Sequence, residues 1–142
     1  MHKNERTVRS LLEEVHKGDV SHVKSTDYFT LNAYYQPLVP AVDPIIGGDA
    51  ILAEISRQLE VYSDLNAEIH VAMANDLYVF TERTDHATII ANGNKVKIPL
   101  MAIYEFSENG RIKAWREIFD TGYAARQIEV DMEAMDKIMG KE

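Results

Sequence analysis

One stretch of this chain constrains its fold more than any other: residues 77–86 begin apolar and turn abruptly into charge, yet keep residue types that favour β-strands. Side chains alternate between the two faces of a strand. Alternation predicts one face made of Leu77, Val79, Thr81, Arg83 and Asp85. An apolar face that continues into an arginine and a carboxylate indicates the wall and floor of a pocket.

The size of the chain predicts a single domain. Its 142 residues, 46% of them hydrophobic, suffice for one core and are too few for two comfortable ones. We therefore expect one globular domain over residues 1–142. The sequence has no run of about 18 apolar residues, and its first residues lead into an amphipathic pattern rather than a signal-peptide core. These features predict a soluble, cytoplasmic protein with no membrane partner.

The composition also restricts the chemistry. The absence of cysteine excludes disulfides, thiolate metal sites and cysteine nucleophiles. The net charge of −8 and the scattered basic residues argue against nucleic acid as a partner. The five histidines have no paired ligand spacing, so we expect neither a metal nor a cofactor.

Apolar residues three and four positions apart predict three helices in the first half of the chain. The first covers about 6–17 and ends at Gly18, and the second is shorter and runs from a cap at Asp19 to about residue 28. The third follows a glycine turn and extends its apolar stripe as far as Tyr62. Between the second and third, residues 30–39 predict a short strand, which the nearby prolines confine to a sheet edge or force into an irregular loop.

From Asp64 onwards the period changes to two, which predicts an antiparallel meander. Hairpin signals at Asn92-Gly93 and Asn109-Gly110 separate its later strands. The longest apolar face belongs to the strand before the second hairpin and consists of Val96, Ile98, Leu100, Ala102, Tyr104 and Phe106.

A final helix is expected after Gly122, over one end of the sheet, with Met132, Met135 and Met139 as a packing or dimer surface. Helices followed by a meander give an α+β domain. A curled sheet with helices on its inner face would form a cone with a deep pocket.

The last predicted strand adds a second set of candidate residues, because Trp115, Glu117 and Phe119 share one face. If that face meets Arg83 and Asp85, a carboxylate, arginine, carboxylate triad results. Burial raises carboxylate pKa values and a central cation lowers them, so one carboxylate can hold a proton while the other stays ionised. The alternative is a cross-strand salt bridge on a solvated face. The apolar residues that precede the charges on this face favour the pocket.

Three segments together resemble the limonene-1,2-epoxide hydrolase family, which lies within the SnoaL-like, NTF2-like (cystatin-like fold) superfamily. They are Phe80-Thr81-Glu82-Arg83-Thr84-Asp85, Glu108-Asn109-Gly110-Arg111-Ile112 and Trp115-Arg116-Glu117-Ile118-Phe119-Asp120. The resemblance implies an NTF2-like cone with N-terminal helices packed in a strongly curved, mostly antiparallel mixed sheet. It also implies a homodimer formed through the convex sheet face.

The resemblance further implies one-step hydrolysis of an apolar epoxide to a vicinal diol. Asp85 would protonate the epoxide oxygen, Arg83 would bridge the carboxylates, Glu117 would act as general base on the attacking water, and Tyr35 would hold that water. Met101 and Phe119 match pocket-lining positions of the family. Trp115 is a further candidate for substrate contact.

Two residues differ from the family pattern. Glu117 stands at the position of an aspartate, and Pro37 at that of a water-binding asparagine, whose amide Gln36, Asn32 or Gln58 would have to supply. Two other functions stay open. The same cone suits a SnoaL-like polyketide cyclase or ketosteroid isomerase-like proton transferase, and it suits a non-catalytic protein that binds a small ligand.

Overall fold

The computed structural model describes residues 1–128. In chain order the elements are α1 (Lys3–His16), α2 (Ser25–Tyr28), β1 (Phe29–Gln36), β2 (Ile45–Ile46), α3 (Gly48–Gln58), β3 (Tyr62–Ala74), β4 (Tyr78–Ile89), β5 (Lys95–Phe106), β6 (Ile112–Phe119) and α4 (Thr121–Ile128). The predicted α+β class is confirmed. The part of the expected last helix beyond residue 128, with its three methionines, lies outside the described residues.

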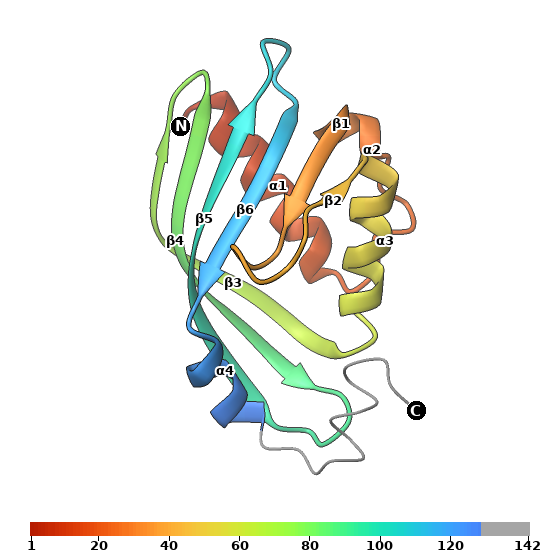
Figure 1. The fold of residues 1–142 in the computed structure, drawn as a ribbon, viewed down its shortest axis with the longest axis vertical. Helices are drawn as coiled ribbons and strands as arrows, with labels where there is room; N and C mark the ends of the chain where they lie inside the picture. Colours follow the sequence, from red (N-terminus) through yellow and green to blue (C-terminus); the bar gives the residue numbers. More distant parts are fainter. Residues whose placement is uncertain (129–142) are drawn as a thin grey trace.

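The six strands form one curved sheet in the order β2-β1-β6-β5-β4-β3, and α1 and α3 lie against its concave face (Figure 1). All strand pairs are antiparallel except β1 with β6. This parallel pair places an early strand beside the last one, with Tyr35 opposite Trp115. The sheet is therefore mixed, and its curvature encloses the space between the helices and the strands.

The amphipathic stripe predicted for the first helix is the face of α1 that packs into the core. Val8, Leu11 and Leu12 are buried, and the helix ends just before Gly18, whose φ of +82° is a conformation that glycine adopts without strain. At the other end, the His2 side chain accepts a hydrogen bond from the Asn4 backbone N–H. The first helix is confirmed.

The second helix is much shorter than predicted. Asp19 caps a turn instead, since its Oδ1 accepts a hydrogen bond from the backbone N–H of Ser21 at 2.8 Å, and helical structure begins only at Ser25. The third helix ends at Gln58, so Tyr62 opens β3 rather than closing the helical stripe. The two-residue strand β2 was not predicted.

The central strands follow the predicted alternation. On β4, Val79, Thr81 and Arg83 point into the core, whereas Leu77 precedes the strand and is exposed, contrary to the prediction. The apolar face of β5 is buried along nearly its whole length. β4 is paired on both sides, and its inner face carries the buried Val79, Thr81 and Arg83 and continues to Asp85 at the cavity.

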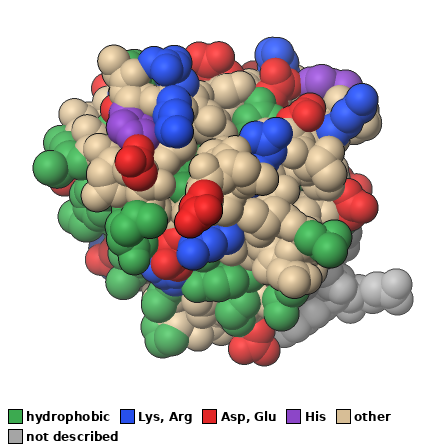
Figure 2. All heavy atoms as spheres, turned by 90° about the horizontal axis from the view of Figure 1, so that it is seen from above, with side chains coloured by type: hydrophobic (Ala, Val, Ile, Leu, Met, Phe, Trp, Pro, Cys, Tyr) green, Lys and Arg blue, Asp and Glu red, His purple; other side chains and the backbone are tan. Residues whose placement is uncertain are grey.

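Charges of both signs are interspersed on the end of the molecule that Figure 2 shows, which carries the start of α1 and the β5–β6 hairpin. This face offers no concentration of basic side chains for a phosphate backbone. Within residues 1–128, none of the helices has the length and apolar character that crossing a membrane requires.

Candidate active site

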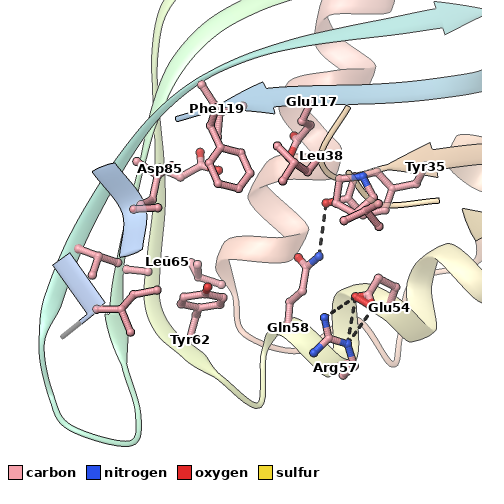
Figure 3. A pocket seen from close by; sticks show the side chains of 18 of the residues that line it. Tyr35, Leu38, Glu54, Arg57, Gln58, Tyr62, Leu65, Asp85, Glu117 and Phe119 are labelled. Carbon is pink, nitrogen blue, oxygen red and sulfur yellow. Dashed lines mark hydrogen bonds and ion pairs between the residues drawn. The ribbon is translucent and has the colours of Figure 1, made fainter. Parts of the chain in front are cut away.

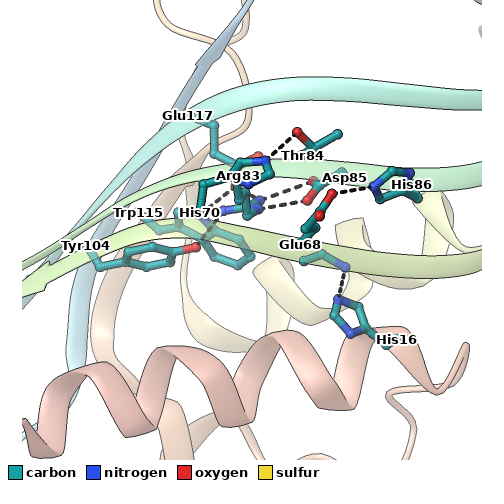
Figure 4. Close-up of polar contacts among 11 residues, drawn as sticks. His16, Glu68, His70, Arg83, Thr84, Asp85, His86, Tyr104, Trp115 and Glu117 are labelled. Atoms are coloured by element: carbon teal, nitrogen blue, oxygen red, sulfur yellow. Dashed lines mark hydrogen bonds and ion pairs between the residues drawn. The ribbon is translucent and has the colours of Figure 1, made fainter. Parts of the chain in front are cut away.

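Arg83 lies at the centre of the site and joins the two predicted carboxylates. Its Nε and Nη2 donate to Asp85 at 2.8 and 3.3 Å, and Nη2 also donates to Glu117 Oε2 at 2.5 Å (Figure 4). The remaining donor, Nη1, reaches the Tyr104 hydroxyl at 3.0 Å. The structure thus brings Arg83, Asp85 and Glu117 together, as the alternation on two separate strands predicted.

The register of β5 explains how the side chains meet. β5 lies between β4 and β6, and its Ala102 stands between Thr81 and Glu117. Alanine is short, so the long Arg83 side chain can reach across β5 to Glu117. Only 3% of Arg83 is exposed, and its charge is therefore balanced by the two carboxylates rather than by water.

Glu117 forms the buried end of this triad. Its Oε2 accepts hydrogen bonds from Arg83 and from the indole N–H of Trp115, the latter at 3.0 Å. Its other oxygen, Oε1, accepts no hydrogen bond from the described residues. Burial raises the pKa of Glu117, the charge of Arg83 opposes that rise, and the charge of Asp85 adds to it. Glu117 therefore has one anchored oxygen and one that can accept a proton.

Asp85 forms the open end of the triad. One third of its side chain is exposed, compared with 8% for Glu117, although both carboxylates share the same guanidinium. Arg83, which both carboxylates share, stays protonated. Burial lowers the pKa of the Arg83 guanidinium, but the nearby charges of Glu117 and Asp85 raise this pKa well above the ordinary value. Arg83 thus stays charged whichever carboxylate carries a proton.

Tyr35 is held beside Glu117 by aromatic stacking. Its ring lies 4.2 Å from the Trp115 ring, and Trp115 in turn lies 5.4 Å from Tyr104, with both pairs stacked. The Tyr35 hydroxyl accepts a hydrogen bond from Gln58 Nε2 at 3.4 Å. Burial and the nearby Glu117 charge raise the pKa of Tyr35 well above its ordinary value, so the hydroxyl keeps its proton.

A cavity of about 370 Å³ opens in front of these groups. Its polar lining includes Tyr35, Gln58, Asp85 and Glu117, and Phe119 lies among the predominantly apolar side chains of its wall (Figure 3). A smaller cavity of about 90 Å³ lies beside Trp115 and His16. Trp115 therefore stands behind the triad, where it holds Glu117 and Tyr35 in place.

Met101 does not line this cavity, so that expectation from the sequence is wrong. Its neighbours Leu100 and Ala102 point into the core, and alternation turns Met101 to the convex face of the sheet, where it is 47% exposed. There it contributes with Ile118 to a shallow groove.

His16 and Tyr62 carried no distinct signal in the sequence, and Gln58 was one of three candidates that the sequence could not separate. His16 accepts a hydrogen bond at Nε2 from the Ala67 backbone N–H at 3.0 Å, and burial lowers its pKa. Gln58 and Tyr62 line the main cavity from the end of α3 and the start of β3. Their convergence depends on how α3 packs on the sheet, which residue spacing alone does not specify. Residues 1–128 contain no group of three or more His, Cys, Asp or Glu side chains that could hold a metal ion.

Comparison with known proteins adds one family match. The sequence model of the SnoaL-like domain family matches residues 8–115. No curated protein sequence matches the chain.

Solved structures share the fold at low sequence identity. An LEH-like epoxide hydrolase from M. tuberculosis is 21% identical, with a TM-score of 0.72 over 97% of this chain and 96% of the other. SalBIII, described as an epoxide hydrolase/cyclase-like enzyme of pyran ring formation in salinomycin, is also 21% identical, with a TM-score of 0.72 over 85% and 93%. A protein from Shewanella denitrificans OS-217, assigned to the SnoaL-like polyketide cyclases, is 14% identical, with a TM-score of 0.76 over 89% and 96%.

Proposed function

Because this chain belongs to the SnoaL-like domain family, we propose that it is an enzyme that adds water to an apolar epoxide. The SnoaL-like family predicted from the sequence is confirmed, whereas the epoxide hydrolase reaction is the proposal. One observation carries it: a buried arginine joins two carboxylates at the end of a largely apolar cavity. Such a set can donate a proton and accept another within one substrate complex.

In the proposed reaction Asp85, at the open end of the triad, donates its proton to the epoxide oxygen as a C–O bond breaks. A water attacks the carbon of that bond and gives a proton to Glu117 Oε1. The products are a vicinal diol, a protonated Glu117 and an ionised Asp85. Glu117 then releases its proton to solvent and Asp85 takes one up, so the starting protonation states return and the net charge of the triad is the same before and after the cycle.

Gln58 can supply the amide that Pro37 lacks. Gln36 donates instead to the Val42 carbonyl oxygen, and Asn32 is exposed, whereas the Gln58 amide contacts the Tyr35 hydroxyl inside the cavity. A water bound by Glu117, Tyr35 and Gln58 would have both of its hydrogens directed at acceptors. Its free lone pair would then face the substrate, which is the orientation that attack requires.

A panel of terpene-like, styrene and steroid epoxides incubated with the purified protein tests the proposal. We expect diol formation from at least one member, and a loss of at least about 100-fold in kcat/KM for Asp85→Asn and for Glu117→Gln, because each removes one proton-transfer group. Asp43→Asn and Glu108→Gln make the same chemical changes at exposed positions and should keep full activity. Intact epoxides across the whole panel would refute the proposal.

A second candidate function is proton transfer next to a carbonyl, as in a cyclase or an isomerase. The raised pKa of Glu117 favours it, since a buried carboxylate of that kind can move a proton on a neutral substrate. Deuterium exchange from solvent into a carbonyl substrate, lost in Glu117→Gln, would identify this reaction. Tight ligand binding without turnover would identify a binding protein instead.

A further inference from the structure

The cavity has a second polar end, away from the triad. Tyr62 at the start of β3 and Arg57 near the end of α3 both line it, and they lie on the opposite side from Glu117 and Asp85 (Figure 3). The proposed chemistry uses neither residue. The cavity can therefore recognise two parts of one molecule.

Arg57 offers hydrogen-bond donors without a net local charge. Its Nε and Nη2 donate to the Glu54 carboxylate at 2.8 to 3.1 Å, which balances the guanidinium charge. Its Nη1 makes no hydrogen bond with the described residues. Glu54 itself lines the cavity, so a carboxylate placed beside Arg57 would meet a second carboxylate. A neutral oxygen suits this position better than an anion.

Tyr62 adds a hydroxyl to the same end. It forms no hydrogen bond with the described residues, although its side chain is only partly exposed. Burial raises its pKa and the charge of Arg57 opposes that rise, with the result that the phenol keeps its proton as a donor. A polar group that faces a cavity without a partner in the fold is placed to bind one on a ligand.

The wall between the two polar ends is apolar. It includes Leu65, Ile98, Leu100 and Phe119. A hydrocarbon segment fits this wall, because burying it there removes apolar surface from water. A volume of about 370 Å³ accommodates a molecule of about ten carbons.

We propose that Tyr62 and Arg57 bind a neutral carbonyl or hydroxyl oxygen of the substrate. The substrate is then an apolar epoxide with a second, uncharged oxygen function at the end remote from the ring. The epoxide part of this statement rests on the proposed function, whereas the binding of the remote oxygen does not.

Three probes of equal chain length test the subsite: 1,2-epoxydecane, 9,10-epoxydecan-1-ol and 9,10-epoxydecanoic acid. We expect a KM about fivefold to tenfold lower for the alcohol than for the hydrocarbon epoxide, as one net hydrogen bond would give, and no such gain for the acid. Tyr62→Phe should abolish the advantage of the alcohol over the hydrocarbon epoxide. Tyr78→Phe, on the convex face, should change neither the KM for the alcohol nor the KM for the hydrocarbon epoxide.

Measuring the dissociation constants of the three probes with the Glu117→Gln variant separates this proposal from the proposed function. If wild-type protein hydrolyses no epoxide but the alcohol still binds more tightly in a manner that Tyr62→Phe abolishes, the subsite stands and the hydrolase proposal fails. Equal dissociation constants for alcohol and hydrocarbon, tighter binding of the acid, or no binding of any probe would overturn the subsite.

Discussion

Arg83 is the residue on which the site depends, because it balances two carboxylates inside the core. Breaking a buried ion pair from one side is costly, since the remaining charge has no partner. We expect Arg83→Leu to lower the free energy of unfolding by about 3 to 5 kcal/mol at neutral pH. Urea unfolding followed by circular dichroism measures this loss.

Two further variants identify the cause of that loss. Glu117→Leu in the Arg83→Leu background should recover part of the stability, because it removes the stranded carboxylate. Lys17→Met, which breaks the exposed pair with Glu14, should have little effect. If Arg83→Leu lowered the free energy of unfolding no more than Lys17→Met does, Arg83 would not be stabilising the two buried carboxylates.

The raised pKa of Glu117 leads to a prediction for the pH dependence of kcat/KM. A general base acts when ionised, and a raised pKa means that its ionised form is lost at a higher pH than for an ordinary glutamate. We expect kcat/KM to fall on the acid side with a midpoint above about 4.3, the usual value for this side chain.

The hydrogen bond from Trp115 opposes the rise in the pKa of Glu117. Trp115→Phe should therefore move the acid limb of the kcat/KM profile to higher pH, because the ionised carboxylate loses a donor. Tyr78→Phe serves as the control on the convex face. An acid limb that stays in place or moves to lower pH would show that Glu117 is not the group whose titration limits the rate.

At the scale of elements, the strands with one buried face were the most predictable. Alternation on β4 and β5 placed Arg83 and Tyr104 inside because a shift of one residue would have exposed the whole apolar set. The same alternation directs Met101 to the convex face, whereas the family resemblance had implied that Met101 lines the pocket. The segment after Gly18 was misjudged because Asp19 caps turns as readily as helices.

Packing of α1 against the sheet should be a major source of stability. Leu11 is fully buried on the inner face of α1, and truncation would leave a cavity beneath the strands. We expect Leu11→Ala to lower the free energy of unfolding by about 2 to 5 kcal/mol. Leu31→Ala makes the same change at a side chain that is 89% exposed and should cost less than about 0.5 kcal/mol. Equal effects of the two substitutions would contradict this packing.

At the scale of the whole molecule, the site depends on contacts that no local pattern encodes. The parallel pairing of β1 with β6 brings Tyr35 to Trp115 across 80 positions of sequence. The packing of α3 then places Gln58 beside Tyr35. Hydrophobic periodicity identifies which face of each element is buried, but not which elements become neighbours. The triad was predictable from alternation as a hypothesis, whereas Tyr35 and Phe119 came from the family resemblance, and the contribution of Tyr62 was not predicted.

The convex face of the sheet carries exposed apolar side chains: Val71, Met73, Phe80, Met101 and Ile118. We propose that two copies of the chain associate through this face. Ile118→Glu should convert a dimer to a monomer, because the interface would bury an unpaired charge. Leu31→Glu introduces the same charge at a different exposed apolar residue and should leave the dimer intact. Sedimentation velocity at micromolar concentration distinguishes these states, and a wild-type monomer would refute the proposal.

The central claim is that the Arg83-centred triad activates water directly. A single turnover with enzyme in excess over epoxide, carried out in H₂¹⁸O and followed by mass spectrometry, tests it most directly. We expect one ¹⁸O atom in the diol from the first turnover, no label in the Asp85 and Glu117 carboxylates, and diol formation at least about 100-fold slower with Asp85→Asn or Glu117→Gln. An unlabelled first-turnover diol would reveal a carboxylate nucleophile, and unconverted epoxide would contradict the claim altogether.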